Sequence, residues 1–357
     1  MRNWLPPWRE PTALDVFGFR LLRIIKAAFG LRRTYVGLGY HGFLASKGGF
    51  IVGRVCEALP PKITQETGTF GNAWSLLRRF SRARGPKARV ALYFDNDYLQ
   101  TETDGTGYFS FNLKAIPIDQ VSEPRVKLIG TPDHLEDLDR YTKVPMTRVH
   151  PKIPLVVVSD IDDTIIQSHA MDFVRSIKVA LATNARSREA VLGMSQFYGK
   201  LSRFFRSRGE GYEPAFCYVT SSSWSLYEFL SEVLRLNQFP AGPLLMQALG
   251  LTQNKLISTR QHSHKLDKIR ALLGLTAKTV PFILIGDSGQ HDRQIYEKIA
   301  RSHKDRIAAI FIRHVPGTAI DNPNQDCPAP LFFFKDGEDL DEIFFNNCQK
   351  LWEKLPH

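Results

Sequence analysis

The sequence has few cysteines and no long uninterrupted apolar segment. Only four cysteines occur among 357 residues and none forms a CxxC pair; they are Cys56, Cys217, Cys327 and Cys348. This scarcity argues against a zinc site or a disulfide framework and favours a reducing, cytoplasmic environment. No stretch is long and apolar enough to span a bilayer. The sequence therefore predicts a cytoplasmic protein, peripheral on a membrane at most.

Negative charge is scarce relative to positive charge. The formal net charge is +11 and the sequence pI is about 9.5. Such a surplus favours anionic partners, among them nucleic acid, acidic lipid headgroups and phosphate esters. We find no aromatic–basic motif of the recognised nucleic-acid-binding kinds, so nucleic acid is not an expected partner. With 43% hydrophobic residues in 357, the composition is that of a globular protein, and the length predicts two domains.

Residues 1–33 predict a basic amphipathic helix. Apolar residues recur there at helical spacing, namely Phe17, Leu21, Ile24 and Ala28. Basic residues lie between and after them, namely Arg20, Arg23, Lys26, Arg32 and Arg33. The charges, and the lack of a small-residue cleavage site, argue against a secretory signal. Two interpretations stay open: the helix lies in an anionic membrane surface, or it packs on its own domain.

Residues 34–150 predict a β-rich, sandwich-like domain. Short alternating segments separated by Gly and Asp turns are typical of antiparallel sheets. The expected strands cover residues 48–55, 88–94, 108–113 and 125–130. The basic stretch 78–84 either binds a phosphate-rich surface or forms a solvated positive face.

Residues 151–357 predict an α/β domain with a doubly wound parallel sheet. Continuous apolar runs alternate with helical patterns, as in sheets covered on both faces. The expected strands are 155–158, 216–219, 281–285 and 308–312. The expected helices are 171–183, 187–207, 224–236, 265–273 and 292–303.

Polar residues follow three of these strands. Asp160 and Asp162 follow the first, Thr220 the second, and Asp287 and Asp292 the third. Because ligands bind at the carboxyl ends of parallel strands, we expect these side chains to converge. Clustered carboxylates repel unless a cation lies between them, and an oxygen-rich cluster suits Mg²⁺ better than zinc. A carboxylate can also attack phosphorus and form an aspartyl-phosphate.

Each of these motifs has a plain structural alternative. Asp163 can be only a turn former or helix cap, and residues 220–223 can be only the cap of the following helix. The sequence 286–289 can be an ordinary turn. The joint occurrence of all three motifs after buried strands favours a site.

The motifs resemble those of a known enzyme superfamily. Residues 159–164, Ser-Asp-Ile-Asp-Asp-Thr, resemble the first motif, DxDx[TV], of the haloacid dehalogenase (HAD) superfamily of phosphatases. Thr220 stands at the position of its second motif, and 286–292 resembles its fourth motif, GDxxxxD. Over residues 150–320 the chain is most similar to the actin-patch phosphatidate phosphatases and their bacterial relatives. Residues 220–223 read Thr-Ser-Ser-Ser, where the fungal enzymes usually read Ser-Asn-Ser-Pro.

The resemblance implies a HAD-like, Rossmannoid fold and a role for each motif residue. Asp160 would be the nucleophile and a metal ligand. Asp162 would be the general acid and then base and also a metal residue, with a backbone carbonyl at Ile161 or Asp162 completing the metal site. Thr220 would bind the phosphoryl group, while Asp287 and Asp292 would hold Mg²⁺. The third-motif lysine would be Lys265, with Lys268 and Lys255 as alternatives.

A helical cap insert at about 168–212 is also implied by the resemblance. Its basic residues either steer an anionic substrate or form an ordinary wet face; they are Arg186, Arg188, Lys200, Arg203, Arg206 and Arg208.

The expected function is that of a Mg²⁺-dependent phosphatidate phosphatase acting through an aspartyl-phosphate on Asp160. The expected partners are a phosphate ester, in the first place phosphatidate, and an anionic membrane surface contacted by the N-terminal helix. Two alternatives stay open: a phosphatase for a soluble phosphoester, and a non-catalytic membrane-associated scaffold. The complete set of motif residues argues against the scaffold.

Overall fold

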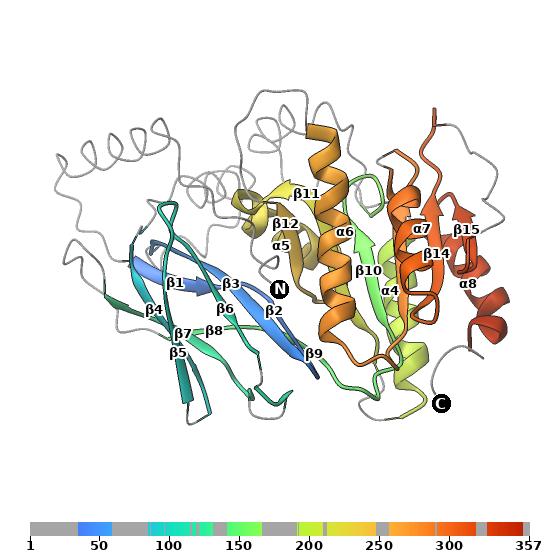
Figure 1. Ribbon diagram of the computed structural model, residues 1–357. Coiled ribbons are helices and arrows are strands. Elements are labelled where there is room, and N and C mark those ends of the chain that lie inside the picture. The colour runs from blue at the N-terminus through green and yellow to red at the C-terminus, as the bar shows by residue number, and fades with distance from the viewer. Residues whose placement is uncertain are drawn as a thin grey trace. The chain divides into compact units, whose positions relative to one another are not determined.

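The computed structural model divides into two compact units, Met1–Thr147 and Arg148–His357 (Figure 1). The structure describes residues 35–58, 85, 87–95, 97–114, 116–118, 121–130, 141–165, 191, 193–209, 213–247, 257–289, 291–318 and 327–352. The predicted helices 1–33 and 171–183 and the basic stretch 78–84 lie outside these residues.

The N-terminal unit contains two antiparallel sheets. In the first, the strands pair in the order β1-β3-β2-β9, and β6 also pairs with β3. The strands are β1 (Tyr35–Gly39), β2 (Gly42–Ala45), β3 (Gly48–Glu57), β6 (Tyr108–Asn112) and β9 (Met146–Val149). The second has the order β5-β4-β7-β8, with β4 (Arg89–Phe94), β5 (Asp97–Glu102), β7 (Arg125–Gly130) and β8 (Thr142–Lys143).

The two sheets share one hydrophobic core and so form a sandwich. On β7, Val126 and Leu128 are buried while Arg125 is exposed, which is the alternation of a strand with one face in the core. Side chains from the first sheet, such as Ile51 and Phe109, belong to the same buried cluster. The antiparallel sheets predicted from the alternating segments are therefore confirmed.

The C-terminal unit contains one six-stranded parallel sheet in the order β12-β11-β10-β13-β14-β15. Its strands are β10 (Val156–Asp160), β11 (Ala215–Ser223), β12 (Leu244–Gln247), β13 (Phe282–Asp287), β14 (Ile307–Arg313) and β15 (Leu331–Phe334). All residues of β10 and β13 are buried, as their unbroken apolar runs predict. The chain order of the strands reverses between β10 and β13, which is where ligands bind in such sheets.

Helices cover both faces of this sheet. They are α4 (Met194–Arg206), η4 (Trp224–Leu226), α5 (Tyr227–Leu236), α6 (Ile257–Leu275), α7 (Asp292–Ser302) and α8 (Gly337–Trp352). The Tyr198 hydroxyl of α4 donates a hydrogen bond to Ser159 Oγ over 2.7 Å, whereas Lys265 of α6 contacts Asp160. Because neighbouring residues of a strand point to opposite faces, α4 and α6 lie on opposite faces of the sheet (Figure 1).

Helix α4 differs from its prediction in extent and in place. The expected helix 187–207 begins at Met194, since Gly193 before it has a left-handed φ of 75°. The expected cap 168–212 includes α4, but α4 buries Phe197 and Phe205, and Phe197 packs edge-to-face on Phe344 of α8 with ring centroids 5.6 Å apart. This part of the expected cap is therefore a core helix, because its apolar stripe covers the sheet. Residues 168–190 lie outside the described residues.

The basic residues of α4 point to solvent. Lys200 pairs with Asp341 over 2.5 Å, and Arg206 pairs with Glu213, both at exposed positions. These pairs fit the wet-face interpretation of this segment; Arg186 and Arg188 lie outside the described residues. In the parts of the chain that the structure describes, no helix has the length and apolarity needed to cross a membrane.

Candidate active site

Asp160 ends the central strand β10 and is completely buried. After it the chain turns, and Asp163 takes a left-handed φ of 58°, which Asp tolerates better than most residues. The Ile165 amide donates to the Ile161 carbonyl over 3.1 Å and closes the turn. Residues 161–165 thus form a compact turn that directly follows the nucleophile expected from the motif.

Thr164 links the ends of strands β10 and β13. Its hydroxyl lies 3.3 Å from Asp160 Oδ2 and 3.4 Å from Asp287 Oδ2, within donating distance of both carboxylates. Thr164 is buried, and it was not assigned a role from the sequence. Its position in the same motif as the aspartates was the sequence signal that could have assigned it to the site.

Asp287 ends β13, next to β10 in the sheet. Its Oδ1 accepts a hydrogen bond from the Gly289 amide over 2.5 Å, and its own amide lies 3.4 Å from Asp292 Oδ2. Gly286 permits this approach, because a Cβ at position 286 would lie 2.6 Å from Asp292 Oδ2 and 2.7 Å from the Cβ of Asp292. Close packing against Asp292 therefore explains the glycine of the GDxxxxD pattern.

Asp292 is the first residue of helix α7. His291 before it has a left-handed φ of 63° and ends the turn. A carboxylate in the first turn of a helix is stabilised by the positive end of the helix dipole. Asp292 is nevertheless fully buried, so its charge also needs a partner in the interior.

That partner is Lys265 of helix α6. Its Nζ lies 2.7 Å from Asp160 Oδ1 and 2.6 Å from Asp292 Oδ1, and the side chain is 2% exposed. Lys265 is therefore the lysine that the structure brings to the aspartates. Lys268, the first alternative, is also buried; burial lowers its pKa to about 8, although Asp267 raises it. Lys255 lies outside the described residues.

Asp162 and Thr220 face each other across the β10–β11 edge. The Thr220 hydroxyl donates to Asp162 Oδ2 over 2.7 Å and accepts from the Ser222 amide over 2.9 Å. Both side chains are buried. The Asp162 carboxylate is thus bound to Thr220, while Asp160, Asp287 and Asp292 form a compact group of three carboxylates; metal binding by Asp162 stays a prediction.

The carboxylates perturb one another strongly. Burial raises the pKa of Asp160 well above its usual range; Lys265 lowers it, and Asp292, Asp287 and Asp162 raise it further. Burial, and then Asp292, raise the pKa of Asp287 to about 7. Burial disfavours the charged form of Lys265, but Asp160 and Asp292 outweigh it and raise the lysine pKa. The single ammonium group of Lys265 therefore does not neutralise the three carboxylates Asp160, Asp287 and Asp292.

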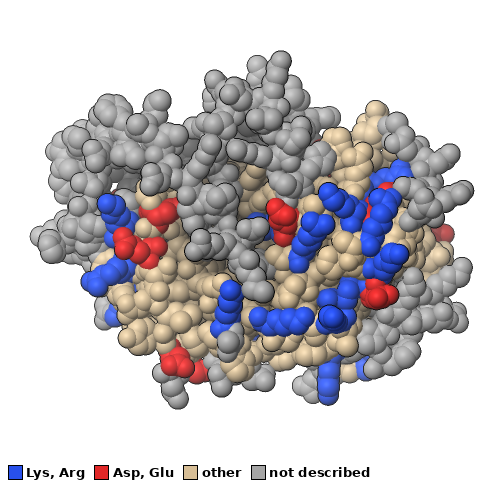
Figure 2. Space-filling view, in the orientation of Figure 1, with Lys and Arg blue, Asp and Glu red and all other residues tan. Residues whose placement is uncertain are grey.

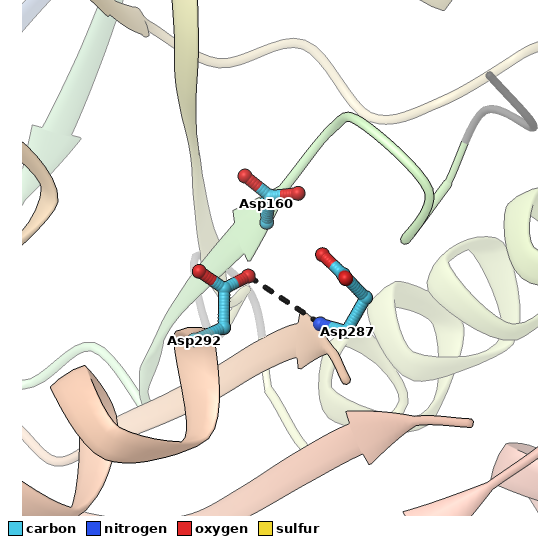
Figure 3. Close-up of side chains that lie close together, drawn as sticks. All are labelled: Asp160, Asp287 and Asp292. Carbon is cyan, nitrogen blue, oxygen red and sulfur yellow. Dashed lines mark hydrogen bonds between the residues drawn. The ribbon is translucent and has the colours of Figure 1, made fainter. Parts of the chain in front are cut away.

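The cluster has the composition of a site for a hard cation. Asp160, Asp287 and Asp292 each offer an oxygen, and the three oxygens lie within 4.8 Å of one another (Figure 3). Figure 3 shows the three side chains converging from the end of β10, the end of β13 and the start of α7. Carboxylate oxygens without Cys or His ligands suit Mg²⁺ rather than zinc. The residues therefore fit a divalent cation, which would offset the remaining negative charge.

Arg313, at the end of β14, is a further residue of this edge that was not expected from the sequence. Its Nη1 donates to the Asp163 carbonyl over 2.6 Å. A contact with a backbone carbonyl leaves no residue pattern, so the sequence holds no signal for it.

Together these features define a parallel α/β domain with a buried carboxylate–lysine cluster at its strand ends, as in enzymes that bind a divalent cation. Residues 155–314 match the family model described as "Phosphatidate phosphatase APP1, catalytic domain". The resemblance to phosphatidate phosphatase catalytic domains drawn from the motifs is thereby confirmed.

Curated relatives match over the same part of the chain. Phosphatidate phosphatase APP1 of Saccharomyces cerevisiae is 28% identical over 170 residues, which cover 48% of this chain and 27% of that protein. An uncharacterized protein of Schizosaccharomyces pombe is 26% identical over 163 residues, covering 44% of this chain and 25% of that protein. The chain thus matches about a quarter of the length of these relatives.

Among solved structures, the chain aligns with a carbohydrate acetylesterase from Xanthomonas citri. The alignment covers 84% of this chain and 70% of that one, at 12% identity and a TM-score of 0.28. A TM-score this low carries no argument about fold or activity.

Proposed function

We propose that the protein is a Mg²⁺-dependent phosphatidate phosphatase that acts through an aspartyl-phosphate on Asp160. The observation that carries the proposal is the buried contact of Lys265 with Asp160 and Asp292, 2.7 and 2.6 Å long, beside Asp287. The family match over residues 155–314 supports the phosphatidate part. The strand order and the helices on both faces are compatible with a doubly wound, HAD-like domain, which is part of the same proposal.

In the first step, an Asp160 carboxylate oxygen attacks the phosphorus of the ester. The bond from phosphorus to the alkoxy oxygen breaks, and Asp162 gives its proton to the leaving oxygen. Asp162 lies on the turn that follows Asp160, bound to Thr220 over 2.7 Å, and this bond orients its carboxyl group. The products of the step are diacylglycerol and the aspartyl-phosphate.

In the second step, water attacks the phosphorus of the aspartyl-phosphate. Asp162, now ionised, takes a proton from the water, and the bond from phosphorus to Asp160 breaks to release phosphate. Lys265 stabilises negative charge on the phosphoryl oxygens. The Thr220 hydroxyl has a single proton, so it donates to a phosphoryl oxygen only after releasing Asp162 Oδ2. Bound Mg²⁺, held by Asp160, Asp287 and Asp292, would supply further charge neutralisation for the phosphoryl oxygens.

The charge of the chain is compatible with an anionic substrate at a membrane. On the face drawn in Figure 2, Lys and Arg side chains predominate over Asp and Glu among the coloured residues. Attachment to an anionic membrane through residues 1–33 belongs to the proposal. Vesicle flotation tests it: replacing Arg20, Arg23 and Lys26 by Gln should release the protein from phosphatidate-containing vesicles.

Phosphate release decides between the proposed substrate and a soluble one. The purified protein is given phosphatidate in mixed micelles and, separately, a panel of soluble phosphomonoesters, with Mg²⁺ or with EDTA. We expect Mg²⁺-dependent release that is fastest from phosphatidate, and a loss of about 10⁴-fold or more for Asp160→Asn. Faster release from a soluble ester would contradict the lipid assignment, and full activity of Asp160→Asn would contradict the mechanism.

Asp267→Asn is a matched control for the same experiment. Asp267 lies two residues from Lys265 on helix α6 but is exposed. This variant makes the same chemical change outside the cluster and should keep the activity of the unmodified protein.

A further inference from the structure

Arg313 joins three loops at the carboxyl edge of the sheet. It is the last residue of β14, and β13 separates β14 from β10 in the sheet. Its side chain reaches the turn that follows β10, where Nη1 donates to the Asp163 carbonyl over 2.6 Å. A single side chain thus spans the edge from β14 to the turn that carries Asp162.

The other end of the guanidinium group is anchored. Arg313 Nε donates to the Lys335 carbonyl, 3.0 Å away, just after β15. The Lys335 amide in turn donates to Asp339 Oδ2 in the first turn of α8, over 2.8 Å. The guanidinium therefore links the turn after β10 to a segment that is itself fixed to a helix.

The backbone of Arg313 contacts the third loop. Its carbonyl accepts a hydrogen bond from the Ser288 amide over 2.9 Å, directly after Asp287. The same residue thereby touches the loops that carry Asp162 and Asp287. The planar guanidinium suits this place, because its donors are fixed in a fork, whereas a lysine ammonium is a single point charge.

The turn 161–165 is held at each of its three central residues. The Asp162 carboxylate accepts from Thr220, the Thr164 hydroxyl contacts Asp160, and the Asp163 carbonyl accepts from Arg313. Asp163 has a φ of 58°, so its peptide group is turned away from ordinary helical or extended directions. The bond from Arg313 stabilises this orientation and, with it, the position of the neighbouring Asp162.

We propose that Arg313 is a positioning residue, which fixes the turn 161–165 so that Asp162 reaches the leaving oxygen of the ester. This inference rests on the proposed function, in which Asp162 protonates that oxygen. Misplacing a catalytic group by about 1 Å can cost about 100-fold in rate. The loss should depend on how much the leaving group needs a proton.

Two esters reveal that dependence. Dioctanoyl phosphatidate releases an alkoxide, which needs protonation, whereas p-nitrophenyl phosphate releases a stable phenolate, which does not. For Arg313→Lys we expect kcat/KM, which reports the steps up to departure of the leaving group, to fall by about 100-fold on the alkyl ester and by less than about tenfold on the aryl ester. An equal loss on both esters, or no loss, overturns the inference.

Arg306→Lys is the matched control. Arg306 precedes the other end of the same strand, where it donates to the Val280 carbonyl over 2.9 Å and to Thr276 Oγ1 over 2.8 Å. This substitution should lower the melting temperature and leave the ratio of the two kcat/KM values unchanged. A general loss of stability thus cannot imitate the expected result.

Hydrogen exchange tests the inference without relying on activity. The Ile165 amide is bonded within the turn, and its exchange should become faster in Arg313→Lys but not in Arg306→Lys. Unchanged exchange in the peptide 159–165 overturns the inference. If the unmodified protein hydrolyses neither ester, the proposed function fails, and exchange alone still decides whether Arg313 holds the turn.

Discussion

The two units differ in the polar groups that they bury. Among the described residues, the buried polar side chains of the sandwich unit are Arg54 and Thr103. Those of the α/β unit are Ser159, Asp160, Asp162, Thr164, Thr220, Ser222, Lys265, Lys268, Thr276, Asp287, Asp292, Glu297 and Arg306. Among the described residues, the core of the sandwich thus contains few such groups.

The buried polar groups also do different things. Thr103 closes a loop, since its hydroxyl donates to the Gly85 carbonyl over 2.7 Å and accepts from the Ala88 amide over 2.8 Å. In the α/β unit, Asp160, Asp287 and Asp292 converge on one point at the cost of mutual repulsion. Buried charge of this kind destabilises a fold unless it is paired. The difference supports the proposal that the carboxylate cluster serves chemistry rather than folding.

Lys265→Met should have the largest effect on stability of the substitutions that separate the two units. The change leaves the buried carboxylates Asp160 and Asp292 without their shared cation, so we expect the free energy of unfolding to fall by about 3–5 kcal/mol in EDTA. Urea titration measures it, and saturating Mg²⁺ should recover part of the loss because it binds the folded state. A loss below about 1 kcal/mol in EDTA would show that the cluster tolerates its charge without the lysine.

Acid should act on the sandwich unit through His41. Burial lowers the pKa of His41 from 6.5 to about 4, so the unfolded chain binds a proton between these values that the folded unit does not. Stability is therefore present above pH 6.5 and lost as the pH falls towards 4, by at most about 3 kcal/mol. Denaturation at several pH values measures the slope, which His41→Gln should reduce and His150→Gln, at an exposed position, should not.

A matched pair of glycine substitutions should separate stability from activity. An added Cβ at Gly53 would collide with Phe109 and with the Leu38 carbonyl in the sandwich, whereas at Gly286 it would displace Asp292. We expect each alanine variant to lose about 1–3 kcal/mol of stability. Only Gly286→Ala should also change the Mg²⁺ concentration needed for half-maximal activity. A comparable change in Gly53→Ala would contradict the separation of roles.

The smallest effect is expected for Lys200→Met. Lys200 pairs with Asp341 on the surface of the same α/β unit, but its side chain is 51% exposed. Exposed ion pairs contribute about 0–1 kcal/mol, so the melting temperature should hardly move. A loss as large as that of Lys265→Met would mean that burial does not separate the two ion pairs.

Much of the α/β sheet could be predicted because its central strands are continuous apolar runs. β10, β11, β13 and β14 all coincide with such runs, as buried parallel strands require. β12 and β15 were not predicted; they are the two edge strands of the sheet. Short apolar runs such as these cannot be told from apolar segments of helices by periodicity alone.

The aspartates of the site could be predicted from their positions after strands, whereas Lys265 was preferred over Lys268 and Lys255 only through the resemblance. Lys265 and Lys268 lie on the same helix, and only the packing of α6 decides which one meets Asp160. Helix α4 was expected in the cap on the resemblance alone, because an apolar stripe in a sequence does not show which surface it covers. The bond from Arg313 to a backbone carbonyl depends on a φ of 58° at Asp163, which no residue pattern announces.

The strand order has a consequence for synthesis of the chain. β10 is made first, yet it lies in the middle of the sheet between β11 and β13. Thr164 must wait for Asp287, 123 residues later, whereas Thr220 reaches Asp162 across only 58 residues. Contacts of such long range form slowly, and unpaired strand edges invite association with other chains. We therefore expect a nascent chain that ends before β13 to expose one edge of β10, and to be the form most in need of a chaperone.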